Sequence, residues 1–425
     1  MKSVKLHIVR LGLIRNADIE ISPMMVFSGE SGLGKSYMAI LCHYFFHVWL
    51  NTKRLDSFFK GLQNSRGINF FSPIGSFPDH DIALEIKKSE FEQWLAKDAI
   101  AYLQYMLGRD GLTAEITVSL PDVIPDRIIF KYEQELVGLN NAEDLYHKLT
   151  VLNVTSRFRQ LGIHDESPYA YVLRFAMINA IFGGIQKLDY SFVLPPSRGT
   201  YMSEEVIGKT GLYNSFIQGM RELEQVQEVA DNVSSQLVDL FRNVMDGEVR
   251  RTGDKYIYIT HGEPIPVSAA ASSIKEIAPL QLMITKRDIS KISVLIEEPE
   301  AHLHPLKQRM MADIVATMSM GNACMQITTH SDYFIRRLND LMRLHIIKKK
   351  IGDAEFAKFC ENNDLFAGLT LDPDIISAYY LERLADGLVC INRQNSATGI
   401  PFDTFKDING KPMADSAMLY EFAME

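Results

Sequence analysis

The segment Gly29–Ser36, with the sequence GESGLGKS, constrains this chain more than any other feature. It fits the phosphate-loop pattern GxxxxGK[ST], and it lies between the short apolar run Met24–Phe27 and the apolar, helix-periodic stretch Ser36–Leu50. Glycines allow successive backbone N–H groups to turn toward one point, where they can hold phosphate oxygens. The helix that follows adds the positive end of its dipole. We therefore predict an α/β protein with a nucleotide-binding loop at the end of a buried strand.

Two residues of the loop have the clearest expected parts in binding a nucleoside triphosphate. The Lys35 ammonium can reach the β- and γ-phosphates, and the Ser36 hydroxyl can be a ligand of Mg²⁺. The other predicted contacts to the phosphates come from the rest of the loop, namely Gly29, Glu30, Ser31, Gly32, Leu33 and Gly34. The loop thus predicts a nucleotide and Mg²⁺ as cofactors.

A second motif places carboxylates at the end of another apolar run. Residues 293–305 read SVLIEEPEAHLHP, so a short buried strand is expected to lead directly into Glu297 and Glu298. Ligands of open α/β sheets bind at the carboxyl ends of the strands. Because successive side chains of a strand alternate, the two carboxylates should diverge. One can then face the Mg²⁺ shell while the other faces the attacking water.

Two weaker signals accompany these motifs. His330 lies in QITTHSD (326–332), at the end of another predicted strand, and would sit beside Glu298 if the two strands pair in parallel. Ser272 and Ser273 precede a helical run in the segment SAAASSIKE. Hydroxyl residues at a helix start are commonly caps, and the same hydroxyls and N–H groups can also bind an anion.

Composition excludes several other classes of protein. The 425 residues are 47% hydrophobic and 23% charged, which is typical of a globular chain that can bury a large core. The formal net charge of −9 argues against a surface devoted to nucleic acid, although a local basic groove is compatible with it. The four cysteines form no CxxC pair, and the N-terminus does not read as a signal peptide. We therefore expect a cytoplasmic protein without membrane contact.

The four pieces, in this order, resemble the ATPase head of the ABC/SMC class. Walker A is Gly29–Ser36, Walker B ends at Glu297 and is followed by Glu298, Ser272–Glu276 resembles the signature, and His330 is the switch histidine. Within that class, EEPEAHLHP closely resembles the OLD-like, AAA15/AAA21-type ATPases, and the PPSR turn at 195–198 fits the same group. Two departures are Ile274, where a glycine is usual, and Glu297, where an aspartate is more usual.

The resemblance implies a mechanism. Two heads would sandwich two ATP molecules, each bound by Walker A of one head and by Ser272 and Ser273 of the other. Glu297 would help to hold Mg²⁺ through water, Glu298 would position and polarise the attacking water, and His330 would contact the γ-phosphate. Assembly into a homodimer or a larger symmetric oligomer would therefore control hydrolysis.

The resemblance and the patterns together predict four parts of the chain. Residues 1–75 form the N-terminal lobe of the head, with Walker A, and residues 189–345 form the C-terminal lobe. Between them, residues 76–188 are expected to be an inserted, mainly helical subdomain, with helical patterning over 76–110 and 142–185 and strands broken by two prolines over 115–132. Residues 346–425 are expected to be a short extension. Within the C-terminal lobe, Gly247–Ile265 is predicted to be a β-meander.

The residues after 345 give little sign of a nuclease. Full OLD nucleases carry a TOPRIM domain with a metal-binding DxD, and Asp372-Pro373-Asp374 spells that pattern. It follows only a weak strand and contains a proline, so we predict a surface turn. A basic cluster could contact nucleic acid or an acidic partner, or be a solvated edge of the head: Arg336, Arg337, Arg343, Lys348, Lys349 and Lys350.

Three functions follow from these observations. The first is an ATPase sensor or scaffold of an anti-phage system such as Septu or PARIS, in which a separate, probable nuclease protein is the effector. The second is a RecF/SMC-like ATPase that clamps DNA, which the absence of a long heptad repeat and the net charge disfavour. The third is a fused nuclease with an unrecognised site.

Overall fold

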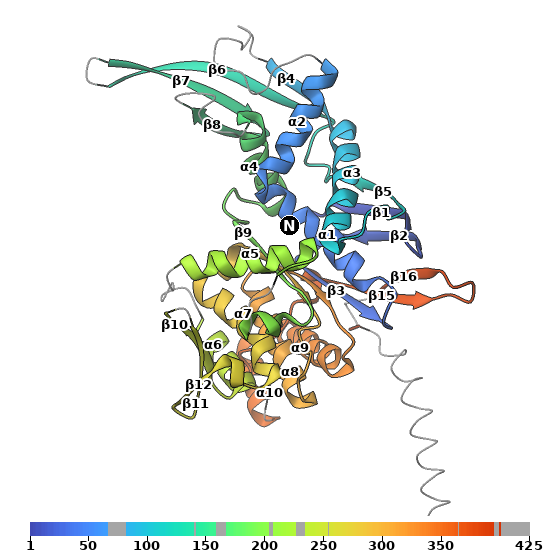
Figure 1. Cartoon of the computed structure of the whole chain (residues 1–425), viewed down its shortest axis with the longest axis vertical. Helices are drawn as coiled ribbons and strands as arrows, with labels where there is room; N and C mark the ends of the chain where they lie inside the picture. Colours follow the sequence, from blue (N-terminus) through green and yellow to red (C-terminus); the bar gives the residue numbers. More distant parts are fainter. Residues whose placement is uncertain are drawn as a thin grey trace, which may run out of the picture.

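The computed structural model describes residues 1–66, 82–139, 142–158, 167–203, 207–226, 234–253, 255–363, 365–394 and 399–400. In this part of the chain, a nine-stranded mixed sheet forms the centre of the molecule (Figure 1). Its strands, in spatial order, are β5 (Ala114–Ser119), β1 (Lys5–Leu11), β2 (Ile14–Glu20), β16 (Val389–Gln394), β15 (Ile376–Arg383), β3 (Met24–Gly29), β14 (Cys324–Thr328), β13 (Ile292–Glu297) and β9 (Tyr190–Leu194). The chain is therefore of the α/β class, as predicted.

The parallel part of the sheet brings the predicted motifs together. Strands β15, β3, β14, β13 and β9 all run in the same direction. Glu297 pairs in register with Thr328, and Thr328 pairs with Phe27. Because the carboxyl ends of parallel strands meet at one edge, the residues after β3, β13 and β14 lie side by side. The predicted parallel pairing of the strands before Glu298 and His330 is confirmed.

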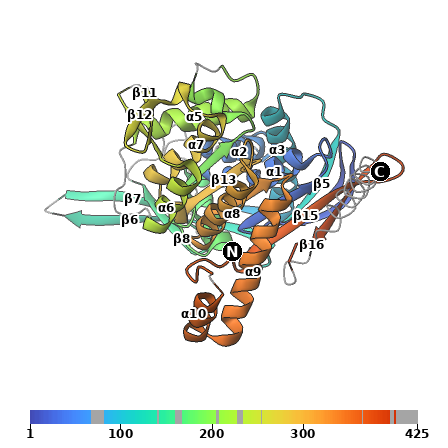
Figure 2. The same ribbon diagram turned by 90° about the horizontal axis from the view of Figure 1, so that it is seen from below.

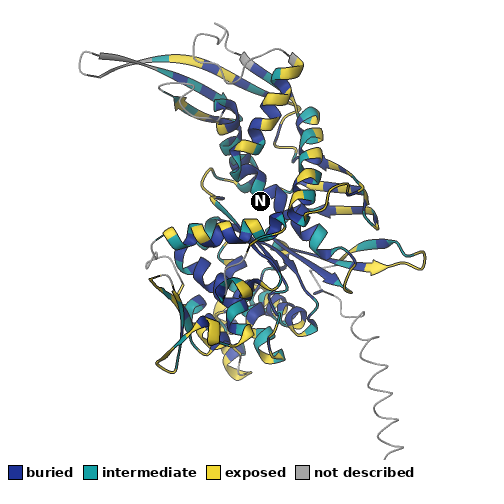
Figure 3. Ribbon diagram, viewed as in Figure 1, coloured by how far each residue is buried: buried dark blue, intermediate teal, exposed yellow. Residues whose placement is uncertain are grey.

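Helix α1 (Lys35–His47) covers this parallel core. It packs against β3, β13 and β14, and ten of its thirteen residues are buried. Strands β13 and β14 are buried along their whole length. Figure 3 shows this concentration of buried residues along the sheet and α1. The apolar sequences of these elements are explained by this position, since a strand covered on both faces has no polar side.

The predicted insertion is not mainly helical, which corrects our expectation. Its described residues include a four-stranded sheet of β4 (Ile82–Lys87), β6 (Arg127–Leu139), β7 (Ala142–Val151) and β8 (Val154–Phe158). This sheet lies with α2 (Thr52–Arg66), α3 (Lys88–Leu107) and α4 (Pro168–Phe182) at the top of Figure 1. The predicted boundary between residues 75 and 76 lies outside the described residues.

The physical reason for this correction is a period of two in burial. In β6, Ile128, Phe130 and Tyr132 are buried while their neighbours are more exposed. In β7, Leu149 and Val151 are buried, and Thr150 between them is half-buried. Such alternation is typical of a strand with one buried face, and a helix would show a period near 3.6. Within the stretch 142–185, which we expected to be helical, the first helix is α4.

The C-terminal residues take part in the main sheet. We expected residues 346–425 to be a short extension, and they supply β15, which pairs with β3, and β16, which pairs with β15. In this register Leu381 lies opposite Gly29 of the predicted phosphate loop. Residues 401–425 lie outside the described part of the chain.

The remaining elements form the lower lobe in Figure 1. The predicted β-meander is confirmed, because β10 (Glu248–Thr252), β11 (Lys255–Thr260) and β12 (Glu263–Pro266) pair antiparallel in this order. The helices are α5 (Gly211–Gln225), α6 (Ser235–Met245), α7 (Ser272–Lys286), α8 (Pro305–Met320), α9 (Asp332–Ile351) and α10 (Asp353–Asn362). Figure 2 shows α9 and α10 projecting away from the sheet. Among the described residues, no helix is both long and apolar enough to cross a membrane.

Candidate active site

The predicted phosphate loop joins β3 to α1. Gly29, Gly32 and Gly34 all have positive φ angles, of 130°, 77° and 100°. A Cβ atom at position 29 would lie 2.3 Å from the carbonyl oxygen of Leu381, so only glycine fits beside β15. Gly34 is the residue directly before α1. The glycines thus turn the backbone in the way that a phosphate cradle requires, and the loop fits the phosphates of a nucleotide.

Lys35 is held at the start of α1 by the loop itself. Its Nζ atom donates to the carbonyl oxygens of Gly29, at 3.0 Å, and Glu30, at 2.7 Å. Burial lowers the pKa of Lys35 to about 8, because an ammonium group loses hydration there. The carboxylates of Glu298, Glu297, Glu300 and Glu30 oppose this shift. The ammonium therefore faces a strongly acidic group of side chains.

Ser36 and Glu297 meet across the edge of the sheet. The Ser36 hydroxyl donates to Glu297 Oε2 over 2.5 Å, although the residues are 261 positions apart. Burial raises the pKa of Glu297, and the hydrogen bond from Ser36 acts in the opposite direction. A hydroxyl and a carboxylate at this distance are oxygen donors of the kind that Mg²⁺ prefers, so the predicted metal residues fit such an ion.

Glu298 and His330 form a second pair, which is open to solvent. Glu298 has a φ of 47° and its N–H donates to the Thr328 carbonyl at 3.0 Å. Its carboxylate lies 3.3 Å from His330 Nε2, and this hydrogen bond lowers the pKa of Glu298. On the other side of the ring, His330 Nδ1 lies 3.5 Å from Lys35 Nζ. Since the ammonium can only donate, Nδ1 is assigned as the acceptor and Nε2–H as the donor to Glu298.

Glu300 positions His330, a role that the sequence did not reveal. This buried carboxylate accepts from Thr329 Oγ1 at 2.6 Å, and from the backbone N–H groups of His330 and Ser331 at 2.9 and 3.2 Å. Burial raises the pKa of Glu300, and the hydrogen bonds from Thr329 and from the His330 N–H oppose that shift. The motif EEPE contains Glu300, but only the fold shows that this carboxylate holds the turn after β14.

Arg198 is a buried residue of the PPSR turn, and its role was not predicted from the sequence. Its guanidinium donates to the carbonyl oxygens of Glu297, at 2.8 Å, Pro195, at 3.1 Å, and Glu276, at 2.8 Å. The Glu276 carboxylate lies 3.7 Å from Arg198 Nε and accepts from the Gly199 N–H. Arg198 thus joins the end of Walker B to α7, the helix that begins at Ser272.

Ser272 and Ser273 are not brought to the phosphate loop of the same chain. They form the first residues of α7, and no hydrogen bond in the described part of the chain joins either serine to the loop. Ser272 is exposed and Ser273 is half-buried. Their predicted contact with ATP bound to another copy stays a prediction.

The remaining candidates lie away from this site. Asp372 caps a short 3₁₀ turn at Pro373–Ile375, and both aspartates of the DxD lie 3.8 Å from Lys349 Nζ. Most cations of the basic cluster on α9 also have acidic neighbours, with Arg336 near Asp332, Arg337 near Asp313, Arg343 near Asp340 and Lys348 near Asp353. The positive charge of this cluster is therefore largely compensated by the neighbouring aspartates.

Comparison with known proteins supports the predicted class, a P-loop ATPase. Residues 213–335 match the family model of the AAA ATPase domain. This match spans Glu297, Glu298 and His330, and together with the geometry of the phosphate loop it supports a P-loop ATPase of the ABC class. No curated protein matches the sequence significantly.

Three solved structures of SMC heads are among the similar ones. An Smc head bound to the C-terminal winged-helix domain of ScpA is 12% identical, with 93% of this chain and 97% of that chain covered and a TM-score of 0.37. The SMC head domain from Thermotoga maritima is 11% identical, with coverages of 92% and 99% and a TM-score of 0.34. The Smc head with an extended coiled coil bound to ScpA, from Pyrococcus furiosus, is 10% identical, with coverages of 93% and 97% and a TM-score of 0.38.

Proposed function

We propose that this chain binds ATP with Mg²⁺ and hydrolyses it at the carboxyl edge of the main sheet. The observation that carries the proposal is the meeting of Lys35, Ser36, Glu297, Glu298 and His330, which come from three distant segments. Lys35 and the loop glycines would hold the phosphates, and Ser36 and Glu297 would hold Mg²⁺. The metal would neutralise charge on the phosphates.

Glu298 is the proposed residue that orients the attacking water. Its lowered pKa keeps the carboxylate ionised at neutral pH, and its exposure to solvent allows water to reach it. Its left-handed backbone separates its side chain from that of Glu297, so the two carboxylates can serve different groups. His330, held by Glu300, keeps a hydrogen bond to Glu298 and can turn to the terminal phosphate.

The decisive experiment separates binding from hydrolysis. Lys35→Ala should abolish ATP binding, whereas Glu298→Gln should retain binding and lower the hydrolysis rate by roughly 10²–10³-fold. Glu361→Gln, at an exposed acid of α10, is the matched control and should hydrolyse ATP like the wild type. Hydrolysis that survives in Glu298→Gln would overturn the role of that residue.

We further propose that the ATP-bound chain assembles with itself and controls a separate effector protein, as an OLD-like member of an anti-phage system. This proposal rests on the EEPEAHLHP resemblance and on the exposed position of Ser272 at the start of α7. The compensated charges of α9 make the alternative, a RecF/SMC-like DNA clamp, less favoured.

Mass photometry of Glu298→Gln with ATP should show a dimer or larger assembly, which Ser272→Arg should prevent. If Glu298→Gln stays a monomer with ATP, the proposed assembly is wrong.

A further inference from the structure

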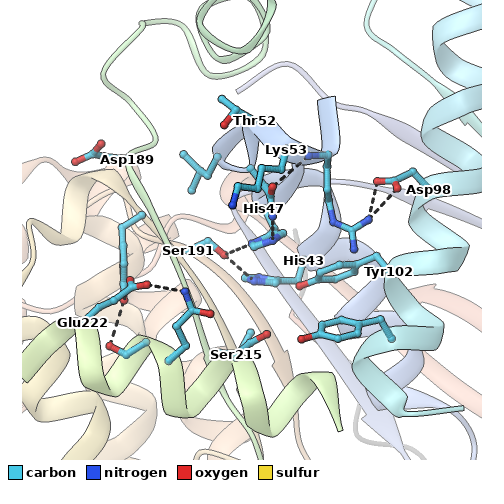
Figure 4. Close-up of a pocket in the computed structure, with 18 of the residues that line it drawn as sticks. His43, His47, Thr52, Lys53, Asp98, Tyr102, Asp189, Ser191, Ser215 and Glu222 are labelled. Carbon is cyan, nitrogen blue, oxygen red and sulfur yellow. Dashed lines mark hydrogen bonds and ion pairs between the residues drawn. The ribbon is translucent and has the colours of Figure 1, made fainter. Parts of the chain in front are cut away.

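A cavity lies at the other end of α1, beside the last strand of the main sheet. It has a volume of about 800 Å³ and is bounded by α1, the start of α2, α3, β9 and α5 (Figure 4). None of the proposed active-site residues lines it. In the described part of the chain, β9 pairs only with β13 and is an edge strand of the nine-stranded sheet. The cavity therefore borders a free edge of this sheet.

The register of β9 on β13 shows which backbone groups point toward the cavity. Leu194 is paired with Ile296. In a parallel pair, this contact is made either by the N–H and C=O of Leu194 itself or by the C=O of Val193 and the N–H of the residue at position 195. Pro195 has no N–H, so Leu194 makes both bonds and faces β13.

Ser191 and Val193 consequently turn their N–H and C=O groups away from β13, because these groups alternate between the two sides of a strand. Both residues line the cavity, whereas Phe192 and Leu194 do not. Among the described residues, no other segment makes a hydrogen bond to the backbone of Ser191 or Val193. Unpaired groups on an edge strand are a template for the addition of another strand.

The side chain of Ser191 is held on the inner side of the strand. His43 Nδ1 donates to Gln326 Oε1 at 2.7 Å, so His43 Nε2 accepts from the Ser191 hydroxyl at 2.9 Å. The same hydroxyl accepts from His47 Nδ1 at 3.3 Å. Burial lowers the pKa of His43 to about 4 and that of His47 to about 3, so both rings are neutral at physiological pH. These contacts hold β9 against α1 and bring no charge to the edge.

Helices on both sides of this edge make it the floor of a groove. Figure 4 shows α5 on one side of β9, and α1 and α3 on the other. Tyr105 of α3 lines the cavity and is 52% exposed, so its ring offers a surface to an apolar side chain. A segment that lies along β9 would therefore contact side chains as well as the backbone.

The charge beside the start of β9 is negative. Asp189, directly before the strand, is exposed, and Glu222 of α5 is half-buried. Figure 4 shows both carboxylates on the same side of the cavity, and no salt bridge joins either of them to a cation in the described part of the chain. The cations that line the cavity are the exposed Lys53 and Arg54, which pairs with Asp98 at 2.8 Å. This end of the groove thus fits a basic side chain.

We propose that the free edge of β9 binds an extended peptide segment of a partner protein, which adds a tenth strand to the main sheet and places a lysine or arginine beside Asp189 and Glu222. The N–H and C=O groups of Ser191 and Val193 bond to the backbone of this segment, and the acidic end and Tyr105 select its side chains. The groove is separate from the phosphate loop, so the proposal stands whether or not the chain hydrolyses ATP.

The test selects ligands for the full chain from a library of random eight-residue peptides. The selected peptides should carry lysine or arginine. Fluorescence anisotropy with such a peptide should show about tenfold weaker binding to Asp189→Lys, because an attraction becomes a repulsion. Glu361→Lys, at an exposed acid of α10 that does not line the cavity, is the matched control and should bind the peptide like the wild type.

Two further measurements test strand addition itself. N-methylation of the peptide, one backbone nitrogen at a time, should weaken binding by about five- to tenfold at alternate residues only, because every second N–H of an added strand faces β9. Hydrogen–deuterium exchange at the Ser191 and Val193 amides should become slower when the peptide is bound. A peptide that binds through its side chains alone would show neither effect.

Three results would overturn the proposal. The first is a selection on the folded chain that gives no peptide able to slow exchange at Ser191 and Val193. The second is equal binding of the selected peptide to Asp189→Lys and to the wild type. The third is a nucleotide-free chain that sediments as a dimer and becomes a monomer in Asp189→Lys, because the edge would then pair with a second copy. Asp189 is exposed, so a loss of folding does not confound its charge reversal.

Discussion

Helix α1 begins at Lys35 among carboxylates and ends at His47 among neutral hydrogen-bonding groups. At the first end, buried charge is retained because opposite charges compensate it. At the second end, burial keeps the histidines neutral, since no carboxylate pairs with either ring in the described chain. The comparison shows that partners, and not burial alone, decide whether a side chain stays charged.

The largest expected effect is at Arg198, which supports the charged end. Arg198→Met should lower the free energy of unfolding by about 3–5 kcal/mol, because Glu276 and three carbonyl oxygens lose their buried donor. Urea denaturation measures this loss. Arg393→Met removes an exposed partner of Glu20 and should cost no more than about 1 kcal/mol. Equal losses in the two variants would contradict the structural role of Arg198.

The second prediction concerns the pH dependence of ATP binding through Lys35. Lys35 is protonated below its pKa of about 8, so its attraction for phosphates is complete there and is lost as the pH rises through that value. ATP affinity should then fall by up to about tenfold per pH unit above pH 8. Lys35→Arg should show no such fall, because a guanidinium stays charged.

Equilibrium binding of ATP across pH 7–10 checks this expectation. If the arginine variant binds too weakly to compare, the wild-type curve decides by itself. If the affinity of the wild type for ATP stays constant up to pH 10, the acidic neighbours keep Lys35 charged, which contradicts the lowered pKa of Lys35.

The smallest effect is at the neutral end. Ser191→Ala should lower the free energy of unfolding by about 1–2 kcal/mol, because His43 loses a donor and His47 loses an acceptor. Ser57→Ala, at an exposed serine on the rim of the cavity, is the control and should change it by less than about 0.5 kcal/mol. If the Ser191→Ala protein is as stable as that control, the hydrogen bonds of Ser191 with His43 and His47 do not stabilise the fold.

Much of the active site could be predicted because its parts are local motifs. A glycine-rich loop after an apolar run and two carboxylates after another apolar run each show in a few consecutive residues. Parallel pairing then brings the ends of β3, β13 and β14 to one edge. The error in the insertion has the opposite origin, because residues 142–151 form a strand through their pairing with β6, which their own sequence pattern does not show.

The sequence by itself determined the phosphate loop, the acidic strand end and the α/β class, since these depend on backbone geometry and on side-chain period. Only the tertiary structure decided that β15 lies beside β3, that Arg198 joins Walker B to α7, and that α1 ends at a polar cavity. These contacts join residues separated by tens to hundreds of positions. No local pattern encodes such contacts, because they depend on how the whole chain packs.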